Sequence, residues 1–310
     1  EEVEKRIDST HYSQQKFRTP GTLTERLWGI YLTYLQEQRE YKICHKQLVF
    51  FRNVEKQKEL YPAFEKNNNV IVSNFNNAYA PVFSTFLASV IAHSTCCNNY
   101  DVIILGTGID QQNRAGLQSM VTKLSNFSIR FFDPKEYLFN LNASVDNSVY
   151  TADMYTRVLS PHVLKNFSKI LMVDADMVCK DDIANLFQTD LEGNWVGAVK
   201  DTVYMGYLNG VVPDTLEYAK KTLKLSDPFC YCNTGVLLYD CAKWREQFSL
   251  EYLQNYISTH HYRIYEQDTI NVLANGNIKF LDQRWNVYTY TNESIERCVR
   301  EAPLIEKERY

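Results

Sequence analysis

Short apolar runs alternate with longer amphipathic stretches between residues 69 and 282. The apolar runs are typical of buried strands, and they occupy 69–75, 100–108, 127–133, 169–173, 195–201, 232–240 and 278–282. The stretches between them predict helices at 80–94, at 110–125, at 149–164, from about 242, and at 266–276. This alternation predicts an α/β domain, a mostly parallel sheet flanked by helices on both faces.

Three residues mark the ends of these predicted helices. Pro81 suits a first helical turn, and Asp110 is a good N-cap for the helix that follows it. Pro161 lacks a backbone N–H, so we expect the helix from 149 to stop at Ser160.

The first 66 residues have a different pattern, being polar and charged. Apolar residues recur every three or four positions within 23–42, which predicts an amphipathic helix. We therefore expect two parts: residues 1–66, a helical segment that is a linker or the tail of an upstream domain, and the α/β domain at 67–310.

Polar side chains stand at the ends of four predicted strands. Asn74 and Asn76 lie at the end of the first strand, Asp174 and Asp176 at the end of the fourth and Asp201 at the end of the fifth, while Asn233 lies at the start of the sixth. Ligands of open α/β sheets bind at the carboxyl ends of strands, so this convergence indicates a binding site. No glycine-rich dinucleotide or phosphate-loop motif follows the first strand.

Composition excludes several classes of protein. The chain has 310 residues, 33 basic against 37 acidic, and no basic run with interleaved aromatics, so nucleic acid is not an expected partner. No apolar run approaches the length of a membrane-spanning helix, and the acidic start "EEVEKRIDST" is unlike a signal peptide. The eight cysteines lack zinc-like spacing, which favours reduced thiols in a cytoplasmic protein.

The two carboxylates of Asp174-Ala175-Asp176 close a buried apolar strand and would repel each other unless something neutralises them. A divalent cation is one solution, and oxygen-only ligands favour Mg²⁺ or Mn²⁺ over zinc. The alternative to a cation is that the carboxylates cap the next turn or pair with Arg or Lys. Spacing alone leaves both open.

Six motifs, one of which contains Asp174 and Asp176, occur in a fixed order: "NAYAPVFSTFLASVIAHS", "MYTRVL", "ILMVDADMV", "NWVGAVKD", "CNTGVLLYDCAKWR" and "EQDTINVL". With them, the chain resembles glycosyltransferase family 8 over about 70–295. This retaining family contains bacterial lipopolysaccharide galactosyl- and glucosyltransferases and glycogenin. The resemblance implies a GT-A (nucleotide-diphospho-sugar transferase) fold, a UDP-sugar donor, most often UDP-galactose or UDP-glucose, and Mn²⁺ or Mg²⁺ as the cofactor.

The resemblance also implies roles for single residues. The carboxylates of Asp174 and Asp176 match the metal ligands, and Asp174 also lies against the donor. The other matches to donor-binding positions are Arg157 near the diphosphate, Asp201 and Asn233 on sugar hydroxyls, and Asn76, Asn77 and Tyr79 near uridine. The family usually has Asp where this chain has Asn after the first strand, so a plain turn is the competing interpretation there. A helix salt bridge competes for Arg157, and a turn cap and a strand-end bond compete for Asp201 and Asn233.

Glu266-Gln267-Asp268 matches a family triplet that often reads Asp-Gln-Asp beside the donor's anomeric carbon, and we predict that these three residues are catalytic. Gln267 is too weak a nucleophile for an attractive covalent route. We therefore favour attack on the face from which UDP leaves, with Gln267 beside an oxocarbenium-like centre. The competing interpretation is a helix N-terminus whose acids complement the helix dipole.

Two departures from the family pattern concern the ends of the chain. The family takes a third metal ligand from a C-terminal His-x-x-Gly-x-x-Lys-Pro-Trp stretch, which this chain lacks, so we expect 67–310 to be a domain without its C-terminal end. His260 and His261 are expected at a helix end or on the surface. Residues 15–35 resemble, more weakly, the end of another capsular-polysaccharide glycosyltransferase-like domain, which suggests a larger multi-domain enzyme.

The leading hypothesis is a retaining, Mn²⁺-dependent hexosyltransferase acting on a glycan or lipid-linked glycan of an O-antigen, capsule or lipopolysaccharide. It would be cytoplasmic, and any contact with the inner face of the membrane would be peripheral, through regions outside this chain. We expect 202–231 to supply acceptor-binding loops whose tyrosines stack on sugars. The alternatives are a non-catalytic nucleotide- or glycan-binding module of a polysaccharide-assembly protein and, less favoured, a metal-dependent phosphatase or nucleotidyltransferase.

Overall fold

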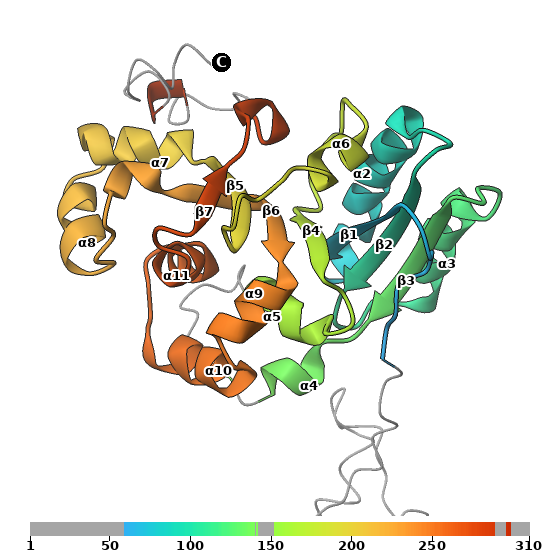
Figure 1. Ribbon diagram of the computed structural model, residues 1–310, viewed down its shortest axis with the longest axis horizontal. Helices are drawn as coiled ribbons and strands as arrows, with labels where there is room; N and C mark the ends of the chain where they lie inside the picture. The colour runs from blue at the N-terminus through green and yellow to red at the C-terminus, as the bar shows by residue number, and fades with distance from the viewer. Residues whose placement is uncertain (1–58, 140, 142–151, 289–295, 299–310) are drawn as a thin grey trace, which may run out of the picture. The chain divides into compact units, whose positions relative to one another are not determined.

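The computed structural model describes residues 59–139, 141, 152–288 and 296–298 (Figure 1). The helix predicted within 23–42 and the weaker resemblance at 15–35 therefore lie outside the described residues. Within them, Ala63 donates its backbone N–H to Asp101 at 3.0 Å, so the chain already contacts the sheet before residue 67.

Seven strands form one sheet in the described part of the chain. They are β1 (Asn68–Asn74), β2 (Asn99–Leu105), β3 (Phe127–Phe132), β4 (Lys169–Val173), β5 (Val196–Lys200), β6 (Cys232–Asp240) and β7 (Ile278–Phe280). Their order is β3-β2-β1-β4-β6-β5-β7, and only β6 runs antiparallel to its neighbours. The mostly parallel mixed sheet predicted from the sequence is confirmed.

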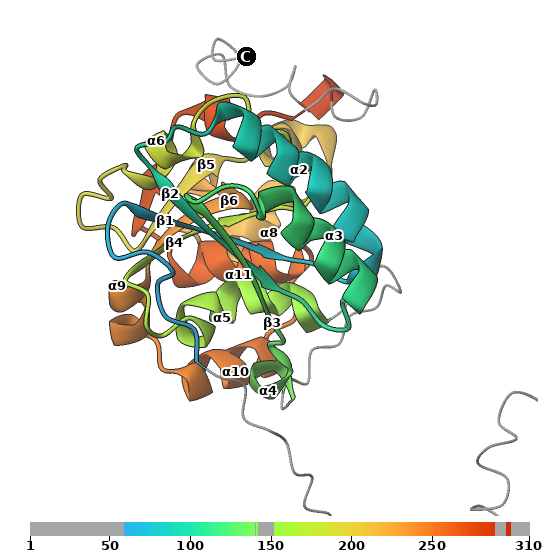
Figure 2. The same ribbon diagram turned by 90° about the vertical axis from the view of Figure 1, so that its right-hand side faces the viewer.

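Helices cover both faces of this sheet, as Figure 2 shows. One core joins the sheet to α2 (Ala80–His93), α3 (Gln111–Val121) and α6 (Ile183–Phe187). The core on the other face involves α5 (Thr156–Val163), α9 (Cys241–Gln247), α10 (Leu250–Thr259) and α11 (Tyr265–Leu273). Successive residues of each strand point to opposite faces, which is why β1, for example, gives Ile71 to the first core and Val72 to the second.

The expectation that Pro161 stops its helix is wrong. Pro161 lies inside α5, which continues to Val163. A proline leaves the carbonyl four residues earlier, that of Arg157, without its helical donor. Two hydroxyls replace that donor: Ser160 Oγ at 3.0 Å and the Tyr239 hydroxyl of β6 at 3.2 Å.

The segment 202–231, predicted to form loops, is partly helical. It contains α7 (Thr202–Gly206), the π-helical turn η4 (Tyr207–Val211), α8 (Thr215–Lys221) and the short η5 (Pro228–Cys230). Their apolar side chains form a third core, which includes Tyr204, Tyr218 and Tyr231. No helix in the described ranges is long and apolar enough to cross a membrane.

A buried ion pair on β2 contributes to stability. Asp101 is fully buried, and Arg130 of β3 donates to both of its carboxylate oxygens, at 2.7 and 2.6 Å from Nη2. Removing one partner of a buried pair leaves an uncompensated charge.

We therefore expect Arg130→Met to lower the free energy of unfolding by about 3 kcal/mol in urea titrations. Lys135→Met, which breaks the exposed pair of Lys135 with Asp133, serves as the matched control and should change little. Equal losses in the two variants would contradict the prediction.

Candidate active site

The polar strand ends meet at one edge of the sheet, as the sequence predicted. β1, β4 and β5 end there, and because β6 is antiparallel, its beginning lies at the same edge. Ile71 pairs with Leu171, a register that brings Asn74 to the level of Asp174. The backbone N–H of Asp174 donates to Gly235 of β6 at 2.8 Å.

Arg157 of α5 connects three of these strand ends. Its guanidinium, which is buried, donates to the carboxylate of Asp174, to the carbonyl of Thr234 and, at 3.5 Å, to Asn74 Oδ1. Burial alone would lower the pKa of Arg157, but attraction to Asp174 and Glu266 outweighs it and raises the pKa. Arg157 is thus a fixed cation inside the site and not a surface residue.

A second group forms around Asp201, whose carboxylate is buried. Its Oδ1 caps α7 by accepting from Tyr204 N at 2.9 Å, and its Oδ2 accepts from Asn233 and Gln267, each at 3.0 Å. Burial raises the pKa of Asp201, and these hydrogen bonds act in the opposite direction. Asp201 and Asn233 therefore combine the expected strand-end bonds with a position in the cluster.

Gly235 lies between the two groups. A Cβ on this residue would lie 2.8 Å from Asp174 Oδ2 and 2.9 Å from Asn233 Oδ1. These distances are shorter than ordinary van der Waals contacts, so only glycine lets both side chains occupy their present positions. We refer to Arg157, Asp174, Asp201, Asn233 and Gln267 as the strand-end cluster.

Gln267 of α11 is held at both ends of its amide. Its Oε1 accepts from the backbone N–H of Thr234 at 3.1 Å, while its Nε2 donates to Asp201. The side chain therefore joins α11 to β6 and to the start of α7. These two hydrogen bonds fix the orientation of the Gln267 side chain beside the start of β6.

Glu266 is the partly exposed neighbour of Gln267 in α11. Burial raises the pKa of Glu266 from 4.5 to about 7, and Arg157 only partly offsets this effect. A carboxyl group with such a pKa can exchange a proton near neutral pH.

The raised pKa of Glu266 predicts a pH-dependent stability. Between pH 4.5 and about 7 the unfolded state binds fewer protons at this residue than the folded state, so the free energy of unfolding falls as pH rises. Glu266→Gln should remove roughly 1–3 kcal/mol of that decline. Urea titrations of the metal-free protein at pH 5 and 7.5 measure it, and parallel declines in both proteins would contradict it.

The carboxylate of Asp268 accepts hydrogen bonds from two tyrosines and one backbone N–H in the described part of the chain. Its carboxylate is fully buried and accepts from Tyr231 at 2.6 Å, from Tyr218 at 2.8 Å and from Ile264 N at 2.9 Å. The last bond is a helix-capping interaction at the start of α11, which matches the competing interpretation of the triplet. Burial raises the pKa of Asp268 against these three donors. The geometry gives this residue an anchoring position.

The loop after β1 is held largely by its own polar residues. Asn76 caps the short helix η2 (Asn77–Tyr79) by accepting from Ala78 N at 3.0 Å. Asn77 donates to Asp110 at 2.8 Å and accepts from Asn113 at 2.8 Å, which ties this loop to α3. Tyr79 is 45% exposed, so among these three it is the residue whose ring can stack on a base.

A metal at Asp174 and Asp176 can be tested against the donor atoms. One oxygen of Asp174 bonds to Arg157, the pairing that the sequence left as an alternative. Asp174 Oδ2 and the exposed carboxylate of Asp176 have no hydrogen-bond or ion-pair partner within the described ranges. No group of three or more His, Cys, Asp or Glu side chains converges among the described residues. The donor set fits a cation such as Mg²⁺ or Mn²⁺ that takes its remaining ligands from phosphates and water.

The two histidines considered from the sequence lie at the end of α10, away from these carboxylates. His260 is the C-cap of α10 and stacks on Tyr256 at 4.0 Å between ring centroids. The expectation of helix-end histidines is confirmed.

Three residues that the sequence analysis did not single out also bond to members of the strand-end cluster. The Tyr288 hydroxyl lies 2.6 Å from Asn233 Nδ2, Asn286 donates to Asn233 Oδ1 at 2.7 Å, and Thr234 contacts Gln267. Thr234 lies in the motif "CNTGVLLYDCAKWR", but Asn286 and Tyr288 follow the last strand in a stretch without periodicity. Only their place after a strand end could have indicated them.

The chain is similar to several known proteins. A family model described as glycosyl transferase family 8 matches residues 70–305. Lipopolysaccharide 1,2-glucosyltransferase of Escherichia coli (strain K12) is 31% identical over 171 residues, which cover 51% of this chain and 47% of that relative.

Two solved structures share the fold. The apo structure of the bifunctional glycosyltransferase WbbM aligns with a TM-score of 0.69 and 25% identity, covering 96% of this chain and 56% of WbbM. The galactosyltransferase LgtC, in complex with donor and acceptor sugar analogues, aligns with a TM-score of 0.55 and 22% identity, covering 76% of this chain and 84% of LgtC. The chain thus has the GT-A fold and spans about half the length of the E. coli relative and of WbbM.

Proposed function

The chain belongs to glycosyl transferase family 8 and is an enzyme that transfers a sugar; from this premise we propose that it is a retaining hexosyltransferase with a UDP-sugar donor. The donor hexose would be galactose or glucose. The acceptor would be a glycan or lipid-linked glycan of a bacterial O-antigen, capsule or lipopolysaccharide, consistent with the name of the E. coli relative. The observation that carries the proposal is the strand-end cluster, in which a fixed cation, two carboxylates and two amides converge.

Asp174 and Asp176 would hold the divalent ion, Mn²⁺ or Mg²⁺, which when bound offsets the negative charge of the departing UDP. Arg157 places a second positive charge beside Asp174, and its planar guanidinium suits phosphate oxygens. Asp201 and Asn233 offer a buried carboxylate and an amide to sugar hydroxyls. Tyr79, with Asn76 and Asn77, would border the uridine.

Gln267 supports attack on the face from which UDP leaves. Its amide is already engaged with Thr234 and Asp201, and an amide is a poor nucleophile, so a covalent intermediate on it is disfavoured. In the step we propose, the acceptor oxygen bonds to the anomeric carbon as the bond from that carbon to the UDP oxygen breaks. The acceptor proton passes to the departing UDP oxygen. Glu266 and Gln267 border this centre, and Asp268 anchors the start of α11 behind it.

The test is calorimetric titration of the full chain with UDP, with and without Mn²⁺. We expect binding at least about tenfold tighter with Mn²⁺, a difference of about 1.4 kcal/mol. Hydrolysis of UDP-galactose or UDP-glucose should likewise require the metal.

One observation favours a different function. Asp174 is paired with Arg157, and among the described residues no third acidic, His or Cys side chain lies close enough to complete a metal site with Asp174 and Asp176. A non-catalytic nucleotide- or glycan-binding module would not need such a site. Such a module would bind UDP no more tightly with Mn²⁺ than without it. The same titration therefore separates the two functions.

The cellular context is also a proposal. Since the chain spans 56% of WbbM, a protein described as bifunctional, we propose that it belongs to a larger multi-domain glycosyltransferase. We place that enzyme in the cytoplasm, with peripheral membrane contact through parts outside this chain.

A further inference from the structure

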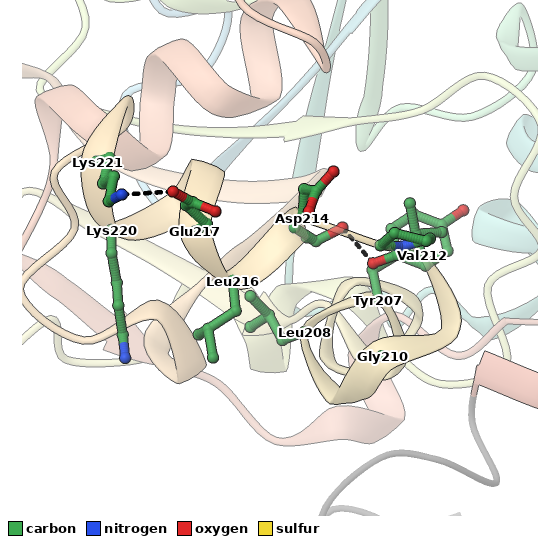
Figure 3. A pocket seen from close by; sticks show the side chains of 11 residues that line it. Tyr207, Leu208, Gly210, Val212, Asp214, Leu216, Glu217, Lys220 and Lys221 are labelled. Atoms are coloured by element: carbon green, nitrogen blue, oxygen red, sulfur yellow. Dashed lines mark hydrogen bonds and ion pairs between the residues drawn. The ribbon is translucent and has the colours of Figure 1, made fainter.

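A groove opens between η4 and α8, in the segment that the sequence assigned to acceptor-binding loops (Figure 3). Its volume is about 450 Å³, within the usual range for small-molecule sites. The chain turns sharply around it: Gly210 has φ of 100° and Asp214 has φ of 62°, both in the left-handed region.

The groove combines apolar and polar surface in a way that suits a sugar. Tyr207, Val212 and Leu216 supply a ring and aliphatic groups, against which the C–H face of a pyranose can pack. The groove is also lined by two acids and two lysines, so their charges sum to zero. Lys221 forms an ion pair with Glu217. A neutral ligand rich in hydroxyl groups fits this balance better than a phosphate or a carboxylate.

The groove is connected to the strand-end cluster through two elements. Asp201 caps α7, and Tyr207 follows six positions later in continuous helical backbone, about 9 Å along the axis. On the other side, Tyr218 of α8 donates to Asp268 at 2.8 Å, and Asp268 is the neighbour of Gln267. The groove thus flanks the site without being part of it.

We propose that this groove binds a sugar unit of the acceptor glycan at some distance from the unit that receives the hexose. The inference rests on the proposed function and adds a property to it: the enzyme recognises an oligosaccharide and not only its terminal sugar. Affinity for acceptor-like glycans therefore increases with their length.

The experiment titrates the full chain with methyl β-glucoside, methyl β-galactoside and the β-linked di-, tri- and tetrasaccharides of glucose and galactose, followed by saturation-transfer NMR. At least one series should bind about tenfold more tightly as a tetrasaccharide than as a monosaccharide. Tyr207→Ala should abolish this gain, whereas the matched Tyr207→Phe, which keeps the ring, should retain it. Val212→Trp, which adds bulk at the 38% exposed rim, should abolish it as well, and circular dichroism confirms that each variant is folded.

Three outcomes would overturn the inference: no saccharide binds the wild-type chain, the length dependence survives both Tyr207→Ala and Val212→Trp, or an apolar dye competes for the groove while every saccharide fails to. UDP titrations with Mn²⁺ on the same samples report on the donor site separately. Saccharide binding without UDP binding would contradict the proposed function, and the reverse would contradict only the groove.

Discussion

Replacing Asp174 with asparagine is expected to lower Mn²⁺-dependent hydrolysis of the UDP-sugar at least about 100-fold. The substitution removes the carboxylate that would hold the cation and, at the same time, the charged partner of the buried Arg157 guanidinium. The remaining partners of Arg157, the Thr234 carbonyl and Asn74, are neutral. The loss should therefore appear both in turnover and as a lower melting temperature of the metal-free protein.

Asp176→Asn provides the matched comparison. Asp176 is exposed and has no ion-pair partner within the described ranges, so its substitution should weaken Mn²⁺ and UDP binding without changing the melting temperature. Glu251→Gln, an exposed acid at the start of α10, should change neither quantity. Normal hydrolysis by a folded double variant of Asp174 and Asp176 would refute the metal-dependent transferase.

The sequence allowed the strands and the edge of the sheet to be predicted because both depend on local pattern. Apolar runs such as 170–173 are fully buried, and the polar residue after each parallel strand reaches the same edge. The position of Asn233, in contrast, depends on the order of the strands in the sheet. It begins β6, and it joins Asp201 only because β6 runs antiparallel between β4 and β5, an order that no local pattern encodes.

What could not be predicted depends on partners distant in sequence. Pro161 continues its helix because Tyr239, on another element, donates to the carbonyl that proline leaves without a helical donor. The helices within 202–221 pack their tyrosines against each other and against Tyr231, so their apolar positions did not show the simple period of a helix on a sheet. The spacing of Asp174 and Asp176 likewise could not reveal that Arg157, seventeen positions earlier, already neutralises one of them.

Gly235→Ala is expected to reduce sugar transfer by about 100-fold while leaving the protein folded. The new Cβ would lie 2.8 Å from Asp174 Oδ2, 2.9 Å from Asn233 Oδ1 and 3.2 Å from Asn286 Nδ2, so at least one of these side chains must move. Displacement of a catalytic group by about 1 Å can cost a factor of about 100 in rate. Steady-state rates of transfer and of UDP-sugar hydrolysis measure the effect.

Gly116→Ala is the matched control, because nothing lies within 4 Å of the position where its Cβ would stand in α3. There the same substitution should raise helix stability by up to about 1 kcal/mol and leave the rate unchanged. A Gly235→Ala protein with normal activity would mean that Asp174 and Asn233 need not occupy their present positions for the reaction. Reduced activity with normal UDP affinity would instead place the effect on the donor sugar, where Asn233 and Asp201 meet, and not on the diphosphate.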